Sequence, residues 1–195
     1  MNHLIIYAHD YEGSYNSAVR GAILHELREH NQTVAVRDLY QLSFNPILTT
    51  QELYGFYEQQ YPDDVSIEQE HIRQADILYF VFPTWWYSVP AILKGYFDRV
   101  FATGFAFRYS KAGPIGLLTG KKAFVFQTAA DPVEALQARH LDSAMQAAIG
   151  VGILHYCGLD VMEHKIMPSI HHASDDNRRE YLSEISKSVA RTIQE

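Results

Sequence analysis

The chain has 195 residues, of which 47% are hydrophobic and 20% are charged, and this is enough to bury the core of one globular domain. A formal net charge of −7 without a basic stripe argues against nucleic acid as a partner, and the single cysteine, Cys157, excludes an internal disulfide framework. Because no apolar run approaches the roughly 20 residues that span a bilayer, and the N-terminus lacks a signal peptide's basic start and cleavage site, we expect a cytoplasmic protein with no membrane insertion.

Short apolar runs alternate with segments of helical periodicity along the whole chain. The elements expected in chain order are a strand at 4–8, a helix over 14–27, a strand at 33–36, a helix over 67–74, a strand at 77–82, a helix over 90–101, a strand at 123–126, a helix over 136–156 bent near Gly150 and Gly152, a strand within 159–167 and a final helix from Ser174. This alternation predicts an α/β fold in a single domain, residues 1–195, with a doubly wound five-stranded parallel sheet and helices on both faces.

Residues 41–62 interrupt the alternation with a segment rich in aromatic side chains. It contains Phe44, Tyr54, Phe56, Tyr57 and Tyr61, which is more than a disordered loop carries. These side chains could pack onto their own domain, or they could form part of a subunit interface, where aromatic residues concentrate. The sequence leaves both interpretations open.

A polar loop with one glycine follows the first strand and opens directly into a helix. It runs from His9 to Ser17 and includes Ser14, Tyr15 and Asn16. Hydroxyl groups, backbone N–H groups and the positive end of a helix dipole would there surround an anion, most simply a phosphate. An ordinary capped helix start would use the same residue types. The loop is neither a Gly-x-Gly-x-x-Gly motif nor a P-loop, so it matches neither of these two nucleotide-binding motifs.

Two further loops follow the third and fourth strands, at the edge where a doubly wound sheet binds its ligand. The residues after the third strand are Pro83, Thr84, Trp85, Trp86 and Tyr87, and those after the fourth are Thr128, Ala129, Ala130 and Asp131. Aromatic planes at this edge suit a flat heterocycle, and small side chains let backbone N–H groups approach a ligand. A phosphate site, an aromatic wall and a small-residue loop on one rim together predict a flavin nucleotide.

Residues 82–109, with the sequence FPTWWYSVPAILKGYFDRVFATGFAFRY, resemble the NAD(P)H:quinone oxidoreductases of flavodoxin-like fold. Similar stretches occur in the first loop and at residues 38–40, 44–47 and 152–158, so the resemblance spans nearly the whole chain. It implies a flavodoxin-like sheet and a homodimeric flavoenzyme. Such an enzyme passes hydride from NAD(P)H through bound FAD, with FMN as the alternative, to a quinone. One cleft used in turn by nicotinamide and quinone implies ping-pong kinetics.

The same resemblance implies which residues contact the cofactor and the substrate. The cofactor contacts are, in chain order, His9, Ser14, Tyr15, Asn16, Ser17, Gln60, Pro83, Thr84, Trp85, Trp86, Tyr87, Thr128, Ala129, Ala130, Asp131 and Arg178. Gln60 and Arg178 match contacts to the adenosine half. Phe107 and Tyr109 fall where the family places aromatic side chains over the substrate cleft, often reaching from one subunit to the other.

The loop after the fourth strand departs from the mammalian-type members of the family. Their glycine-rich loop is followed by a tyrosine and a histidine that steady charge on the reduced flavin. Here the tyrosine position falls on Val133, and the histidine position falls on Arg139 or, with a shift of one residue, on His140. His140 is therefore the candidate catalytic residue. Some relatives are cytoplasmic ancillary subunits of potassium efflux systems, and that role is the alternative function.

The sequence lacks the residue patterns typical of metal sites and of hydrolase nucleophiles. The ten histidines include no His-Glu-x-x-His motif and there is no cysteine pair, so no metal site is expected. Ser88 lacks the Gly-x-Ser-x-Gly setting of a hydrolase nucleophile. Cys157, at a predicted helix end, fits a buried small side chain, and His171 and His172 are interpreted as part of a loop rather than a site.

Overall fold

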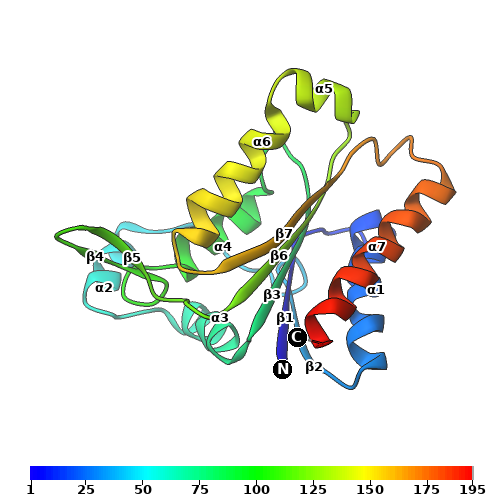
Figure 1. The fold of residues 1–195 in the computed structure, drawn as a ribbon. Coiled ribbons are helices and arrows are strands. Elements are labelled where there is room, and N and C mark those ends of the chain that lie inside the picture. The colour runs from blue at the N-terminus through cyan, green and yellow to red at the C-terminus, as the bar shows by residue number, and fades with distance from the viewer. Residues whose placement is uncertain (195) are drawn as a thin grey trace.

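The computed structural model describes residues 1–194 as a parallel sheet with helices on both faces, accompanied by a separate hairpin (Figure 1). The strands are β1 (Asn2–Tyr7), β2 (Thr33–Asp38), β3 (Ile77–Pro83), β4 (Phe107–Ser110), β5 (Gly113–Gly116), β6 (Lys122–Thr128) and β7 (Asp160–Met167). The helices are α1 (Tyr15–Glu29), α2 (Thr50–Tyr57), α3 (Asp63–Gln74), α4 (Ala91–Val100), α5 (Val133–Ala138), α6 (Leu141–Gln146), η1 (Ala147–His155) and α7 (Asp175–Gln194). All five strands expected from the sequence are present in the sheet.

The sheet has the strand order β2-β1-β3-β6-β7, and every neighbouring pair is parallel. The chain first builds outward from β1 to β2, and it then crosses back to place β3 on the other side of β1. This reversal leaves a crevice beyond the carboxyl ends of β1 and β3, where doubly wound sheets bind their ligands. The topology therefore brings the loops after β1, β3 and β6 to one rim.

Two hydrophobic clusters, one on each face of the sheet, hold the helices in place. Along β1, Leu4 and Ile6 belong to the cluster with α3, α4 and η1, whereas Ile5 and Tyr7 belong to the cluster with α1 and α7. Figure 1 shows α1 and α7 together on one side of the sheet. Because both faces are covered, the central strands are continuous apolar runs, which is the pattern that identified them in the sequence.

The aromatic segment 41–62 contains a short helix, α2, that was not expected from the sequence. Phe44 and Phe56 are buried in their own domain, and the Tyr61 hydroxyl donates to a backbone carbonyl at 2.9 Å. Tyr54 and Tyr57, by contrast, are 70% and 64% exposed. The first interpretation is therefore confirmed for the buried side chains, and the interface stays a prediction for the exposed pair.

A buried arginine ties this segment to two other helices. Arg99 of α4 is 3% exposed, and its guanidinium donates to Glu52 of α2 at 2.5 Å and to Asp64 of α3 at 2.6 Å. It also donates to the Asn45 carbonyl at 2.9 Å. The Arg99 side chain thus holds three parts of the chain together: the residues around Asn45, helix α2 and helix α3.

The helix expected over 136–156 is divided into α5, α6 and η1. His140 takes a left-handed conformation with φ of 55° and separates α5 from α6. From Leu141 the helix runs on into η1, a π-helix that includes Gly150 and Gly152, where the sequence predicted a bend. The β4–β5 hairpin was not expected either, and its strands are four residues each with Gly113 at φ of 120°.

In the described part of the chain, no helix is both long enough and apolar enough to cross a bilayer. The residues of this part also include no group of three histidine, cysteine, aspartate or glutamate side chains placed to hold a metal ion. Cys157 is 3% exposed, and burial raises the pKa of its thiol to about 12. The prediction of a buried small side chain is confirmed, and the thiol is unreactive at neutral pH.

Two helix glycines differ in the space around them, and this difference predicts opposite effects on stability. A Cβ on Gly95 of α4 would lie 2.2 Å from the Pro46 carbonyl oxygen, whereas a Cβ on Gly21 of α1 would meet no described atom within 4 Å. We expect Gly95→Ala to lower the free energy of unfolding by about 1–3 kcal/mol because the backbones must separate. Gly21→Ala should raise it by about 0.5–1 kcal/mol, because alanine favours the helix. Urea denaturation measures both changes, and shifts of the same sign would contradict the close α4 packing.

Candidate active site

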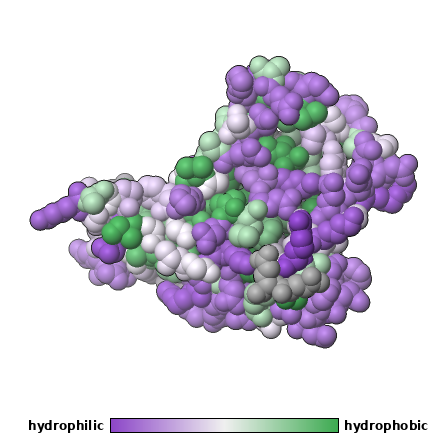
Figure 2. All heavy atoms as spheres, viewed as in Figure 1, coloured by the Kyte–Doolittle hydropathy of each residue, from purple (hydrophilic) through white to green (hydrophobic). Residues whose placement is uncertain are grey.

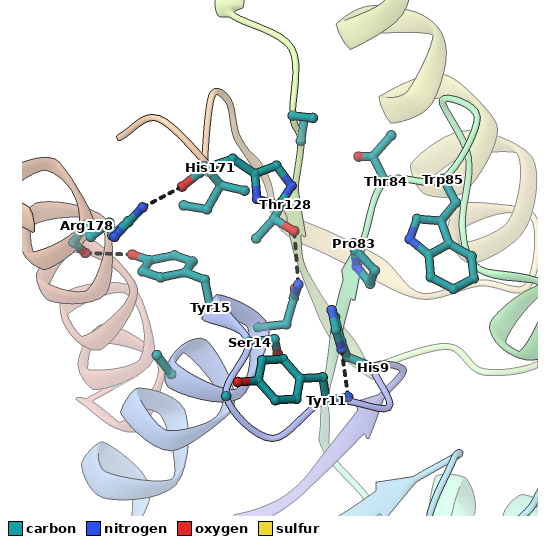
Figure 3. A pocket seen from close by; sticks show the side chains of 16 residues that line it. His9, Tyr11, Ser14, Tyr15, Pro83, Thr84, Trp85, Thr128, His171 and Arg178 are labelled. Atoms are coloured by element: carbon teal, nitrogen blue, oxygen red, sulfur yellow. Dashed lines mark hydrogen bonds between the residues drawn. The ribbon is translucent and has the colours of Figure 1, made fainter. Parts of the chain in front are cut away.

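A cavity of about 700 Å³ lies beyond the carboxyl ends of the sheet strands (Figure 3). The loops after β1, β3, β6 and β7 and the first turns of α1 and α7 surround it. The lining residues are His9, Tyr11, Gly13, Ser14, Tyr15, Asn16, Ala18, Pro83, Thr84, Trp85, Thr128, Ala129, Ala130, Ile170, His171 and Arg178. Its volume lies within the range of about 300–1,000 Å³ that is typical of small-molecule sites.

The loop after β1 both caps α1 and contributes to the cavity. The Ser14 hydroxyl accepts the Ser17 N–H at 3.1 Å, which is the N-cap bond of the helix. The N–H groups of Tyr15 and Asn16 open the helix, and no earlier turn supplies carbonyls for them. They provide donors and a positive dipole end for an anion. The capped helix start is therefore confirmed, and the phosphate site stays a prediction that uses other atoms of the same loop.

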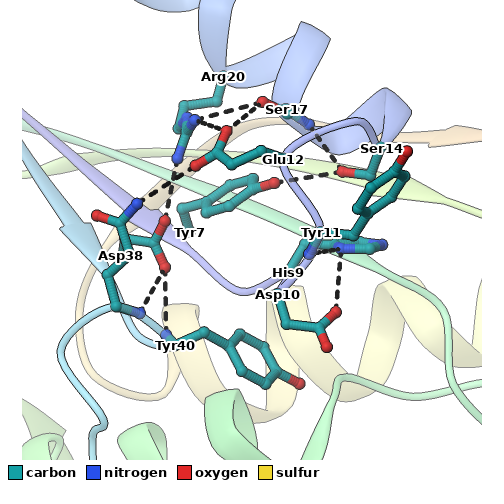
Figure 4. Close-up of polar contacts among 11 residues, drawn as sticks. Tyr7, His9, Asp10, Tyr11, Glu12, Ser14, Ser17, Arg20, Asp38 and Tyr40 are labelled. Carbon is teal, nitrogen blue, oxygen red and sulfur yellow. Dashed lines mark hydrogen bonds and ion pairs between the residues drawn. The ribbon is translucent and has the colours of Figure 1, made fainter.

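A cluster of charged side chains behind the loop fixes its path (Figure 4). Arg20 of α1 donates to Glu12 at 2.6 Å and to Asp38 at 3.0 Å, and its guanidinium lies over the Tyr7 ring. The Ser17 hydroxyl donates to Glu12 at 2.9 Å. The hydrogen bonds from Arg20 and Ser17 hold the pKa of Glu12 below its usual value. Of the two acidic residues of this loop, Glu12 is thus paired outside the cavity, and Asp10 lies 3.6 Å from the His9 ring nitrogen.

The cavity suits an anion although the whole chain is acidic. Among the described residues, those that line it include Arg178, His9 and His171 but no aspartate or glutamate. Burial raises the pKa of Tyr15 to about 12, so its hydroxyl stays protonated and donates to the Arg178 carbonyl at 2.6 Å. The Arg178 guanidinium donates to the Ile170 carbonyl at 3.1 Å, which fixes it at the cavity edge. A phosphate would meet hydrogen-bond donors and no acidic side chain in this lining, although Arg178 also pairs with Asp175 at 3.5 Å.

The surroundings of Asn16 show whether a flavin nucleotide would fit these residues. Its side chain is 3% exposed, and Nδ2 donates to Thr128 Oγ1 at 3.0 Å. Among the described residues, Oδ1 of Asn16 is buried and has no hydrogen-bond partner. An unsatisfied buried acceptor costs roughly 1–3 kcal/mol, which a ligand with O–H or N–H donors would recover. The ribityl hydroxyls of a flavin are such donors and its phosphate suits the α1 N-terminus, so the residues fit this cofactor.

An aromatic wall with a strained turn lies on the β3 side of the cavity. Trp85 lines the cavity, and its backbone pairs with Ser88 through two hydrogen bonds of 3.0 Å. Trp86 and Tyr87 form the centre of this two-residue turn with φ of 52° and 54°. Asparagine and glycine ordinarily occupy such positions, and a bulkier residue costs roughly 1–3 kcal/mol. Trp86 is also 95% exposed, so a large aromatic group is held in strain at the rim.

Most of the predicted cofactor contacts are brought together in the cavity. Those that line it are His9, Ser14, Tyr15, Asn16, Pro83, Thr84, Trp85, Thr128, Ala129, Ala130 and Arg178. Those that lie outside its lining are Ser17, Gln60, Trp86, Tyr87 and Asp131. The structure therefore assembles the core of the predicted site from three separate loops and the first turn of α7.

The predicted site residues that do not line the cavity lie elsewhere in the chain. The Tyr87 hydroxyl donates to Asp131 at 2.9 Å and accepts from Arg139 at 3.1 Å, which builds a polar cluster beside the cavity. Gln60 follows α2 and does not line the cavity. His140, the candidate catalytic residue, is exposed between α5 and α6 and does not line the cavity.

The two predicted substrate contacts lie on the β4–β5 hairpin. Phe107 and Tyr109 pack edge to face with ring centroids 5.5 Å apart, and Phe107 packs similarly on Tyr156 at 5.2 Å. Tyr109 is 63% exposed. Neither residue lines the cavity of its own chain.

The loop after β7 contributes residues that sequence reasoning missed. Ile170 and His171 line the cavity, and so does Tyr11 in the first loop. The Ile170 N–H donates to the Ala129 carbonyl at 3.0 Å, which joins this loop to the one after β6. The sequence did hold the signal, because residues at the carboxyl end of the fifth strand fall on the same rim as the others.

Comparisons with known proteins agree with this arrangement. A family model described as "Flavodoxin-like fold" matches residues 1–189. The chain is 36% identical over 187 residues to an uncharacterized NAD(P)H oxidoreductase of Haemophilus influenzae, covering 95% of this chain and 92% of that protein. It is 35% identical over 200 residues to NAD(P)H dehydrogenase (quinone) 1 of Cavia porcellus, covering 92% of this chain and 73% of that one. The NAD(P)H:quinone oxidoreductase from Methanothermobacter marburgensis has a TM-score of 0.84 and 29% identity, covering 97% of this chain and 94% of that chain.

The fold, the cavity and these matches define a flavin-dependent oxidoreductase of the flavodoxin-like class. Within that class, the chain belongs to the NAD(P)H:quinone oxidoreductase family. The relatives reported above are named as oxidoreductases, so they favour the enzyme over the alternative of an ancillary subunit of a potassium efflux system.

Proposed function

We propose that this protein passes hydride from NAD(P)H, through one non-covalently bound FAD per chain, to a quinone or a similar acceptor with ping-pong kinetics. Bound flavin supplies the hydride chemistry, which no side chain of the protein provides. One observation carries the proposal: Asn16, whose buried Oδ1 has no partner among residues 1–194, lines a cavity at the N-terminus of α1 that has no acidic side chain among its described lining residues. The cytoplasm, where nicotinamide nucleotides and quinones are available to a reductase, is the proposed location.

The chain's own residues bind and shield the cofactor. The N–H groups of Tyr15 and Asn16 and the Arg178 guanidinium supply positive charge for the phosphates. Trp85 would cover the ring end and keep water from it. The small side chain of Ala130 would leave its backbone open to the part of the ring where negative charge develops, whereas the Ala129 N–H is already bonded to the Met167 carbonyl at 2.8 Å. His140 stays a candidate for steadying that charge from outside the cavity lining.

Identification of the bound cofactor tests this proposal directly. We expect the purified protein to be yellow and to release FAD on denaturation, at one molecule per chain by mass spectrometry and absorbance. Steady-state rates with NADH or NADPH and a panel of quinones should give parallel double-reciprocal lines. Recovery of FMN alone at full occupancy would contradict the adenosine contacts assigned to Gln60 and Arg178. A colourless protein that takes up neither flavin would contradict the function itself.

We also propose that the protein is a homodimer with the hairpin of one chain beside the cavity of the other. Phe107 and Tyr109 do not line their own cavity, so a role in substrate binding requires a second chain. Figure 1 shows the hairpin projecting at the α2 end of the molecule, and Tyr54 on α2 is exposed. Figure 2 shows hydrophobic residues near the middle of this face, where η1 and β7 lie, and Val151 of η1 is 64% exposed.

Light scattering measures the assembly. We expect a mass of twice the 22.3 kDa chain at micromolar concentration. Tyr109→Glu, which places a charge on the exposed hairpin, should shift the population toward the single chain. Glu29→Lys, at the exposed C-terminal end of α1, serves as a surface-charge control and should leave the mass unchanged. A single-chain mass for the natural protein would rule out the shared cleft.

A further inference from the structure

A row of buried polar side chains connects the cavity with a second groove on the same sheet. Gln127 of β6 is 0% exposed, and its Nε2 lies 2.7 Å from the Thr84 hydroxyl oxygen. Its Oε1 lies 3.0 Å from Nε2 of His164 on β7. Thr84 lines the cavity, whereas His164 lines a groove of about 430 Å³ between η1 and β7. The row thus runs from β3 through β6 to β7.

The hydrogen-bond partners decide which way each group in this row points. Burial lowers the pKa of His164 to about 4, so the ring is neutral at pH 7 and carries one N–H. With its proton on Nε2, His164 donates to the Gln127 oxygen, and the Gln127 amide group then donates to Thr84. In this state the amide also donates to the Met145 sulfur at 3.1 Å.

The opposite orientation is less favourable. With the Gln127 amide reversed, its oxygen would face the Met145 sulfur, and His164 would carry its proton on Nδ1. That atom is buried and has no partner among the described residues, and an unpaired buried N–H is rarer in proteins than an unpaired acceptor. His164 therefore selects the orientation in which the Thr84 oxygen accepts from Gln127. The hydroxyl hydrogen of Thr84 then has a long hydrogen bond to the Met145 sulfur at 4.0 Å, and a ligand acceptor would replace this weak partner.

We propose that His164 and Gln127 are positioning residues that hold Thr84 as a hydrogen-bond donor toward the ring of the bound cofactor. The ligand group it would meet is an acceptor on a heteroaromatic ring, a ring nitrogen or a carbonyl oxygen. The identity of the ligand in this inference rests on the proposed function. The direction of the row, in which His164 donates to Gln127 and Gln127 donates to Thr84, does not depend on that function. Ala129, Leu136 and Met145 form an apolar cluster at this end of the molecule, which strengthens each hydrogen bond of the row.

The direction of the row can be measured without any cofactor. In flavin-free protein labelled with ¹⁵N-histidine, we expect the His164 ring to show the Nε2–H tautomer and to stay neutral down to about pH 5, because burial disfavours its charged form. An Nδ1–H tautomer would overturn the proposal. If the natural protein binds no flavin, the proposed function fails, but this spectrum still decides whether the row has the stated direction.

Variants in flavin-loaded protein test the effect on the ligand. Gln127→Glu keeps the shape but can only accept, so it draws the Thr84 hydroxyl away from the cavity. We expect the flavin dissociation constant to rise about 3- to 10-fold, the value of one hydrogen bond, with a shift of the flavin absorption bands. Thr84→Val should give a similar rise. Gln69→Glu is the control, because Gln69 is also buried but bonds the Val100 carbonyl away from the cavity.

The double variant separates positioning from a general structural role. If Gln127 acts through Thr84, Gln127→Glu should change the dissociation constant and the spectrum by less than twofold when Thr84→Val is already present. An undiminished effect in that background would overturn the proposal. His164→Gln, which retains an N–H donor, should preserve flavin binding better than His164→Leu, and equal losses would also count against the row.

Discussion

Replacing Arg99 with methionine is expected to lower the free energy of unfolding by about 3–5 kcal/mol, because it leaves the paired carboxylates without their buried partner. Arg99 is 3% exposed and Glu52 is 13% exposed at the side chain, so Glu52 cannot recover full hydration. Urea denaturation followed by circular dichroism measures the change. Lys94→Met is the matched control, since the Lys94–Asp98 pair lies on the same helix but is exposed, and its loss should cost no more than about 0.5 kcal/mol.

The same network predicts how stability depends on pH. The hydrogen bond from Arg99 holds the pKa of Asp64 below its usual value. In Glu52, burial alone would raise the pKa, but the hydrogen bonds from Arg99 and Thr49 outweigh it and the pKa is lowered. Carboxyls depressed in the folded state stabilise it above their unfolded pKa values of about 4, and this stabilisation is lost as the pH falls through the folded values.

The natural protein should therefore lose more stability than Arg99→Met between about pH 5 and about pH 3. Denaturation midpoints at a series of pH values, compared for the two proteins, give this difference. Equal losses of stability in the two proteins would show that Arg99 does not depress these pKa values. Another interaction would then have to hold the 41–62 segment in place.

Replacing Asn16 with aspartate is expected to weaken flavin binding about 100-fold, the equivalent of losing a buried hydrogen bond and adding an unpaired buried charge. The new carboxylate cannot donate to Thr128, and it adds negative charge beside the phosphate site. Asn16→Ala should weaken binding about 10-fold, because it removes the hydrogen bonds without adding charge. Turnover per bound flavin should stay nearly unchanged in both variants. Fluorescence titration of flavin-free protein and rates normalised to bound flavin give the two quantities.

Ser17 provides the control for this experiment within the same turn of α1. Its hydroxyl bonds Glu12 outside the cavity, so Ser17→Ala should change the dissociation constant by less than about twofold, as expected when no ligand contact is lost. Reduced turnover per flavin in Asn16→Asp, with unchanged affinity, would mean that the cofactor lies in the reverse orientation. The loop after β1 would then not be the phosphate site.

The sheet and the position of the cavity could be predicted because both follow from simple physical rules. Strands covered on both faces are continuous apolar runs, and Ile77 to Phe82 is such a run. In a doubly wound parallel sheet, the loops that follow the strands meet at one rim. This rule places Asn16, Trp85 and Thr128 together from the sequence alone, and all three line the cavity.

Other features leave no periodic signal. The β4–β5 hairpin has strands of four residues, too short for alternation to stand out. The break at His140 depends on a left-handed φ, which a histidine in the sequence does not predict. The exposed position of Trp86 depends on the conformation of the turn that contains it. The role of Gln127 was invisible because a single polar residue in an apolar strand gives no hint of its neighbours on other strands.

The turn at Trp86 and Tyr87 also has a consequence for engineering and for evolution. Its backbone would be more stable with asparagine and glycine, so the chain carries two bulky aromatics at a thermodynamic cost. A search for heat-resistant variants by screening melting temperature alone would tend to replace these residues first. Such a screen would reward the loss of aromatic surface beside the cavity, and thermal robustness would then compete with the cofactor contacts that the sequence predicts for this turn.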